Sequence, residues 1–511
     1  MLGVVKALAK PPQLATDAEA FLKALDAWRQ SESIGDLADL LSFSVDGALR
    51  GVLADAARAA LKHSGAPRTM KLVAQEILEE GCSVKRVWRN EPITVEVRTL
   101  RALLREAPND TVALVDLAQH HLSQNKSRAA ERALLTAYQI SPRSVYVVRA
   151  FARFWIHRGR PDRAHALIKS SGLAAYDPWV MASEIAIAQA AGGHSIQLRK
   201  AQRALATKLY TPTDISELAG AVAGFEITNG NFREARKLFR LALEHPNDNV
   251  LAQAITNQQY LGIEVDEQII KRAPNGVFEG RALNAMLLGK FEEAAGYTAS
   301  WSEEESFSSR PRMLQSYFFG ALGEYQKSLS AAEAGLLSDP KDDGLRANRA
   351  YALAGLERFT EAEAELKLLE AKDAPQQRPS VLATRGMVFM LQGQADEGIR
   401  LYEAAVVELE KAKAEEQVSD CLAFMARTAF RADIEQRDAV LARANERFAL
   451  KPSPAASVIL KSMQQTVADV AAPELRKIVQ WEWDPTSNTL SQRKELTRIG
   501  APGFVVADRQ K

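Results

Sequence analysis

The stretch NFREARKLF, residues 231–239, recurs in altered form as KFEEAAGYT at 290–298 and as RFTEAEAEL at 358–366. Each copy begins with a polar residue and Phe, and an Ala follows after two further residues. In the first two copies a Gly stands immediately before the stretch, at the end of a segment with helical spacing of apolar residues. Because Gly readily adopts the positive φ found at helix C-termini, this order indicates that one helix ends and a second begins. The recurring stretch therefore predicts the second helix of a helix–turn–helix pair.

Extending this alignment along the chain reveals a repeat. Units that start at 111, 145 and 179, and again at 275, 309 and 343, are separated by 34 residues, and units at 216 and 379 fit after insertions of three and two residues. Small residues at the eighth and twentieth places let the two helices of a unit cross with their backbones close together, and the fifteenth place forms the turn. Pro142 and Pro340 close their units, since Pro cannot continue a helix. The eighth places are Ala118, Ala152, Ala186, Ala223, Ala282, Ser316, Ala350 and Gly386; the fifteenth are Asn125, Gly159, Gly193, Gly230, Gly289, Gly323, Glu357 and Gly393; the twentieth are Ala130, Ala164, Leu198, Ala235, Ala294, Ser328, Ala362 and Gly398.

The period, the spacing of small and turn residues and the closing prolines resemble those of the tetratricopeptide repeat family, across about residues 111–412. The resemblance implies an all-α fold, a right-handed α-solenoid of helix–turn–helix repeats with helical caps at both ends. One gap, from 216 to 275, is 59 residues long, and we expect it to hold a shortened helix pair. The array is therefore expected to be irregular near 250–274.

Outside the repeat, the pattern predicts three further regions. Residues 1–92 form an N-terminal helical region in which Thr16 caps a helix that places Phe21, Leu25 and Trp28 on one face. The array occupies 93–412, and helices around 416–432, 436–449 and 455–469 form a C-terminal cap at 413–472, which hides an otherwise exposed apolar face. The tail, 473–511, contains the alternating stretch IVQWEWDPTSN, which either folds back along the array or docks onto a partner.

Charge is distributed unevenly along the chain, although the net charge is only +1. Residues 101–210 carry 16 Lys and Arg against 7 Asp and Glu, and five of the seven His residues lie there. A local positive excess of this kind attracts anionic partners. The composition, 47% hydrophobic and 25% charged, is that of a folded chain.

Neither the cysteines nor the N-terminus suggests export. With only Cys82 and Cys421 there is neither a disulfide framework nor a zinc motif, which fits a reducing compartment. The N-terminal run lacks a signal-peptide pattern, and no apolar window is long enough for a membrane span. We therefore expect a cytoplasmic protein.

The sequence contains no catalytic, metal or cofactor motif that rises above chance. We expect both cysteines to be core residues, and His121 to pack in the place that the family fills with an aromatic side chain. The prediction is that the chain is not an enzyme and binds no cofactor.

A partner surface is the remaining source of function. The family resemblance implies that the second, fifth, ninth, twelfth and thirteenth places of each unit line the concave face of the solenoid. One part of this surface is cationic, and the other is apolar and aromatic. Methionine and tyrosine side chains, which form the second part, are common in adaptable protein-binding grooves. The alternatives are that neighbouring acidic side chains neutralise the arginines and that tight coiling buries the aromatic part. The candidate partner-binding residues are Tyr146, Arg149, Arg153, His157, Arg310, Met313, Tyr317, Tyr351, Met387 and Met390.

These observations predict a non-catalytic scaffold or adaptor that holds a peptide, a helix or an acidic segment of a partner protein in its concave groove. If the stripe of Arg149, Arg153 and His157 is not neutralised, binding of an acidic ligand should strengthen as His157 becomes protonated. The alternative is a nucleic-acid-associated protein, or a sensor or regulatory subunit, that uses the basic block at 101–210 while a partner supplies the chemistry. The sequence does not indicate an oligomeric state.

Overall fold

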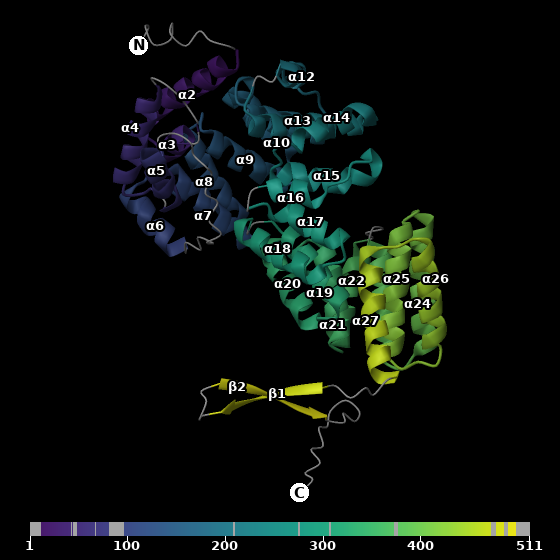
Figure 1. The fold of residues 1–511 in the computed structure, drawn as a ribbon. Coiled ribbons are helices and arrows are strands. Elements are labelled where there is room, and N and C mark those ends of the chain that lie inside the picture. The colour runs from purple at the N-terminus through teal and green to yellow at the C-terminus, as the bar shows by residue number, and fades with distance from the viewer. Residues whose placement is uncertain are drawn as a thin grey trace. The chain divides into compact units, whose positions relative to one another are not determined.

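In the computed structural model, most of the described backbone is helical (Figure 1). The all-α repeat architecture predicted from the sequence is confirmed. The structure describes residues 12–41, 43, 49–66, 68–80, 97–207, 210–273, 276–305, 308–372, 377–471, 477–484 and 489–496.

The repeat region consists of successive pairs of helices joined by short turns. The first helices begin within four residues of the predicted unit starts. The pairs are α7 (Thr111–Ser123) with α8 (Ser127–Ile140), α9 (Val145–His157) with α10 (Pro161–Ser171), α11 (Pro178–Ala190) with α12 (Leu198–Thr207), α13 (Pro212–Thr228) with α14 (Phe232–Ala242), α17 (Phe278–Leu287) with α18 (Phe291–Glu304), α19 (Arg310–Leu322) with α20 (Tyr325–Ser338), α21 (Asp343–Gly355) with α22 (Phe359–Ala371), and α23 (Arg378–Leu391) with α24 (Ala395–Lys411).

The turn between the helices of a pair adopts the left-handed conformation that the sequence pattern predicts. Seven of the eight predicted fifteenth places have positive φ, from +55° at Asn125 to +82° at Gly393. Two of these residues, Asn125 and Glu357, are not glycines, so the turn geometry is kept even where the side chain makes it less favourable.

The small residues at the eighth and twentieth places lie where the two helices cross. In the α19–α20 pair, the Ser316 hydroxyl donates to the carbonyl of Ser328 at 2.9 Å, and the Ser328 hydroxyl donates to the carbonyl of Ser316 at 2.8 Å. In the α23–α24 pair, a Cβ added at Gly386 would lie 2.8 Å from the carbonyl oxygen of Gly398. Larger side chains at these places would force the helices apart.

The third unit departs from the predicted register by one residue. Asp177 caps α11 by accepting a hydrogen bond from the Val180 amide at 2.8 Å, so the helix begins at Pro178 and its turn falls at Gly192. Ala186 is consequently exposed, and the prediction that it lies at the helix crossing is wrong. On the second helix, the fully buried small residue is Ala201 rather than the predicted Leu198.

The long gap in the repeat holds a shortened pair, as predicted. It consists of α15 (Asp248–Leu261), which ends at Gly262 with φ +57°, and the short α16 (Glu267–Arg272). The Asp248 carboxylate accepts hydrogen bonds from three amides at the start of α17, those of Phe278, Glu279 and Gly280, at 2.7–3.1 Å. The shortened pair is thus tied directly to the next regular unit.

Among the described residues, five helices precede the regular array. In the first of them, Phe21, Leu25 and Trp28 face the N-terminal core as predicted, but Thr16 lies inside the helix, which begins at Pro12, so the prediction of a Thr16 cap is wrong. Asp39 accepts hydrogen bonds from the amides at the start of α9, including that of Val145 at 2.6 Å. The five helices are α2 (Pro12–Ser31), α3 (Ile34–Leu41), α4 (Leu49–Lys62), α5 (Arg68–Glu80) and α6 (Val97–Glu106).

The chain divides into two compact units, residues 1–320 with 324–352, and residues 321–323 with 353–511. The second unit contains three helices after the repeat, α25 (Glu415–Arg431), α26 (Arg437–Leu450) and α27 (Pro454–Ala471), close to the predicted cap helices. The alternating stretch of the tail forms an antiparallel hairpin of β1 (Lys477–Asp484) and β2 (Thr489–Leu496).

Candidate functional site

Eight of the ten candidate residues lie on α9, α19 and α21, each the first helix of its repeat pair. All eight belong to the first of the two compact units, and we call this set of residues the first-helix face. On α9, Val147, Val148 and Phe151 point into the core, so the spacing of the helix leaves Arg149 and Arg153 exposed. Ser144 begins the helix by accepting a hydrogen bond from the Val147 amide at 3.3 Å. The first-helix face consists of Tyr146, Arg149, Arg153, His157, Arg310, Met313, Tyr317 and Tyr351.

Carboxylates from distant segments neutralise much of the cationic part of this face. Arg153 forms an ion pair with Glu305, which follows the end of α18, and Arg310 pairs with Glu279 at 2.8 Å. The guanidinium of Arg149 lies 4.9 Å from the ring centroid of Trp179. The arginine stripe that the sequence predicts is therefore engaged within the fold.

These charges form one cluster that joins α9 to helices more than a hundred residues later. Burial, together with the charges of Asp248 and Glu305, raises the pKa of Glu279 to about 7, although Arg310 and Arg153 act in the opposite direction. The Glu304 pKa is also raised to about 7, mainly by burial. Each of these two carboxyl groups therefore titrates near neutral pH.

The His157 ring belongs to the same cluster. Its pKa is lowered, first by desolvation and then by the positive charge of Arg153, while Glu305 opposes the shift. Protonation of His157 thus requires a lower pH than for an ordinary histidine. If protonated His157 strengthens the binding of an acidic ligand, this effect therefore begins at a lower pH than an ordinary histidine would give.

The aromatic part of the face is built by contact between α19 and α21. The Asn348 side-chain amide donates to the Met313 carbonyl at 2.9 Å, and a Cβ at Gly320 would lie 3.4 Å from the Tyr351 ring. Tyr317 and Tyr351 therefore lie on neighbouring helices, each partly exposed. Tyr317 also packs on the buried Phe291, with ring centroids 6.2 Å apart.

Met387 and Met390 do not lie on a surface. Their exposed fractions are 0% and 1%, so the prediction that they line the groove is corrected. The glycine at the twentieth place of this unit explains the burial of Met390: a Cβ added to Gly398 would lie only 2.5 Å from the Met390 Cγ. The methionine occupies the space that a side chain at position 398 would otherwise fill.

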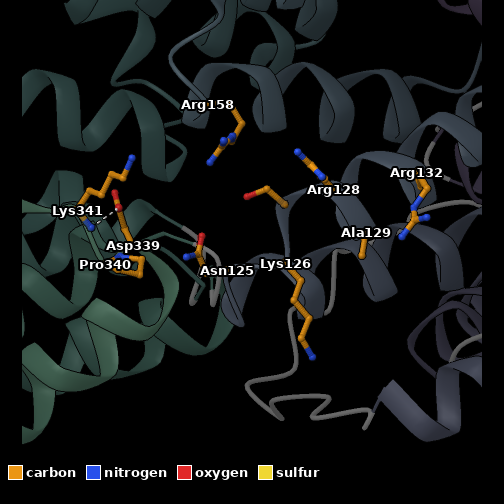
Figure 2. A pocket seen from close by; sticks show the side chains of 10 residues that line it. Asn125, Lys126, Arg128, Ala129, Arg132, Arg158, Asp339, Pro340 and Lys341 are labelled. Atoms are coloured by element: carbon orange, nitrogen blue, oxygen red, sulfur yellow. Dashed lines mark hydrogen bonds between the residues drawn. The ribbon is translucent and has the colours of Figure 1, made fainter.

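A second cationic surface, which the sequence did not single out, lies elsewhere in the first unit. The turn before α8, the end of α9 and the loop between α20 and α21 enclose a cleft of about 620 Å³ (Figure 2). We call it the basic cleft and define it by Lys126, Arg128, Arg132, Arg158, Asp339 and Lys341. Five of these six side chains are cationic.

The basic cleft was missed because its residues come from three parts of the chain. Four of its cations fall within the basic block at 101–210, and this positive excess is the sequence feature that points to the cleft. The fifth, Lys341, lies in a region whose overall balance is acidic, and nothing in the repeat pattern brings it close to Arg128. Contact between α7 and α20 places the two segments together.

Two further residues with reactive side chains, Cys421 and His121, lie in the core. Cys421 is a buried free thiol whose pKa burial raises to about 12, and His121 is buried on α7; both are core residues, as predicted. Cys82 lies outside the described residues. Across the part of the chain that the structure describes, no three His, Cys, Asp or Glu side chains are arranged to hold a metal ion. Within the same residues, no helix has the length and apolarity that crossing a membrane requires.

Comparisons with known proteins do not assign a family to the chain. No protein-family model matches the chain, and no curated protein matches it. A solved structure described as the crystal structure of yeast Tom70 is similar, with 13% sequence identity, coverage of 73% of this chain and 85% of that chain, and a TM-score of 0.29. This score describes a loose likeness, and the assignment of a tetratricopeptide-like helical repeat rests on the units described above.

Proposed function

We propose that this protein is a non-catalytic interaction scaffold that holds a segment of a partner protein on its first-helix face. The partner would contact the apolar and aromatic part of this face, which is formed by the partly exposed side chains of Met313, Tyr317 and Tyr351. The residues Tyr146, Arg149, Arg153, His157 and Arg310 would border the bound segment.

The observation that supports the proposal is the neighbouring placement of Tyr317 and Tyr351 beside the small Gly320. Tyrosine combines a large apolar contact area with a hydroxyl that can hydrogen-bond, and it loses little side-chain entropy on binding. Because Gly320 has no side chain, the Tyr351 ring can lie directly against α19, next to the helical turn that carries Tyr317. Stacked first helices repeat such positions along one face, which suits an extended segment or a helix.

The test is affinity capture from a lysate with quantitative mass spectrometry, using the wild-type chain and the Tyr317→Ala/Tyr351→Ala double variant. Proteins that require the face should be retained by the wild type and lost by the variant. Tyr297→Ala is the matched control, since Tyr297 is a partly buried tyrosine on the second helix α18 that hydrogen-bonds to Glu293.

Circular dichroism establishes that the variants remain folded. The proposal is wrong if folded double variant and wild type retain the same proteins. It is also wrong if the control loses the same proteins as the double variant, because the loss would then not depend on the first-helix face.

A further inference from the structure

We propose that the basic cleft is a second binding site, which takes an acidic peptide segment whose carboxylate or phosphate groups pair with Arg128 and Arg158. This goes beyond the proposed function, because the cleft shares no residue with the first-helix face.

The side chains of the basic cleft come from both sides of one open space. Figure 2 shows Arg158 and Arg128 directed toward the same open space from the end of α9 and the start of α8. Asp339 and Lys341 stand on the opposite side, on the loop between α20 and α21. A ligand in this space meets cations on both sides.

The arginines of the cleft form no ion pair or side-chain hydrogen bond with the other described residues. Among the described residues, the guanidinium groups of Arg128, Arg132 and Arg158 make no hydrogen bond or ion pair, and all three side chains are exposed. By contrast, nearby Arg160 is held by Asp162 through two hydrogen bonds of 2.8–3.0 Å. A guanidinium without an internal partner keeps its planar fork of donors available for a carboxylate or a phosphate.

The backbone adds a favourable field to the cleft. Helix α8 is 14 residues long and begins here, with Lys126 at its N-cap and no side chain that caps its amides. A helix N-terminus carries a partial positive charge and unsatisfied N–H groups. Together with the convergent arginines, it favours an anionic group placed near Ser127.

The lining favours a peptide over a nucleic acid. Of the ten described residues that line the cleft, none is aromatic, so there is no ring on which a base could stack. Asp339 adds a carboxylate to one wall, which repels a continuous phosphate backbone but can accept a hydrogen bond from a peptide N–H or hydroxyl. A short peptide with spaced anionic groups fits both features.

The test is fluorescence anisotropy with labelled probes on the full chain. One peptide is rich in glutamate, a second carries phosphoserine at the same positions, and a third is neutral; a single-stranded oligonucleotide is the fourth probe. The proteins are the wild type, Arg128→Glu/Arg158→Glu, and the charge-matched control Arg199→Glu/Arg203→Glu on α12, whose side chains are exposed outside the cleft.

The proposal predicts that at least one acidic peptide binds the wild type and that the cleft variant weakens this binding by about tenfold or more. The control should change the Kd by no more than about twofold. The two acidic arms show whether carboxylate or phosphate is preferred, and either preference supports the site.

Three results would overturn the proposal: neither acidic peptide binds, the control loses as much affinity as the cleft variant, or the oligonucleotide binds more tightly than both peptides in a manner that depends on Arg128 and Arg158. None of these results bears on Tyr317 and Tyr351. Failure of this site is therefore distinguishable from failure of the proposed function.

Discussion

Arg153 and Arg158 lie five residues apart, one within α9 and the other at its C-terminal cap, but their surroundings differ. Arg153 pairs with Glu305 in a cluster that includes Glu279 and Arg310, whereas the Arg158 guanidinium has no partner among the described residues and lines the basic cleft. The two arginines belong to the same basic block and the same repeat. The difference shows that a carboxylate far along the chain decides whether a surface cation is structural or available.

Helix α9 carries Arg153 and ends at Arg158, so both surfaces depend on how this helix packs. Replacing Ala152 by Leu at its crossing with α10 inserts extra volume where Ala152 and Ala164 are both buried, and it should destabilise the chain by about 2 kcal/mol or more. Urea unfolding followed by circular dichroism measures the change. Ala186→Leu, at an exposed position of α11, should cost less than about 0.5 kcal/mol. Similar costs at both positions would contradict the assigned crossing.

A charge reversal separates the two arginines by their structural role. Arg153→Glu places a new carboxylate beside Glu305, and we expect it to lower the free energy of unfolding by about 1 kcal/mol. Arg158→Glu removes no internal partner and should change stability by less than about 0.5 kcal/mol. Unfolding midpoints of the two variants against the wild type test this. Equal losses of stability would mean that the ion pair of Arg153 does not stabilise the fold more than Arg158, unpaired among the described residues, does.

The cluster around Arg153 also makes the stability of the fold depend on pH. Because the folded-state pKa of Glu279 is about 7, above the ordinary value of 4.5, its contribution to stability is complete below about pH 4.5 and is lost as the pH rises through about 7. His157, whose pKa is lowered, contributes in the opposite sense and loses its share as the pH falls. Glu279→Gln should reduce the decline of stability between about pH 4.5 and pH 7 by at most about 1.4 kcal/mol per pH unit. Unfolding curves across this range measure the slope, and an unchanged slope would show that Glu279 does not titrate in the folded chain.

The smallest expected effect comes from removing the carboxylate that pairs with Arg153, which leaves this arginine without the charge of Glu305. Glu305→Gln removes the charge that neutralises Arg153, so an acidic peptide should gain about twofold to fivefold in affinity for the first-helix face. The gain is measured in the Arg128→Glu/Arg158→Glu background, where the cleft does not contribute. Asp162→Asn is the control, since it frees only the exposed Arg160. No gain over this control would contradict the role of Glu305.

The sequence predicts the local parts of this fold well. The helix pairs can be predicted because one residue in each repeat forms the turn and two small residues mark the helix crossing. Even Asn125 and Glu357 adopt the predicted positive φ. The register fails only where a local feature overrides the period, as at Asp177 and Ala186.

The site was harder to predict, because it depends on contacts between distant segments. The repeat gives the face of α9 on which Arg153 lies, but not that Glu305 reaches it from the end of α18. The burial of Met390 depends on the neighbouring Gly398, and the basic cleft depends on contact between α7 and α20. None of these contacts leaves a periodic signal.

The most direct test of the difference between the two arginines is the Kd of an acidic peptide for Arg158→Gln and for Arg153→Gln, measured side by side. Both variants remove one positive charge, so long-range attraction falls equally in the two proteins. We expect Arg158→Gln to weaken binding by about fivefold and Arg153→Gln to change it by less than about twofold. Equal losses, or a larger loss for Arg153→Gln, would contradict the claim that the fold engages Arg153 and leaves Arg158 for a ligand.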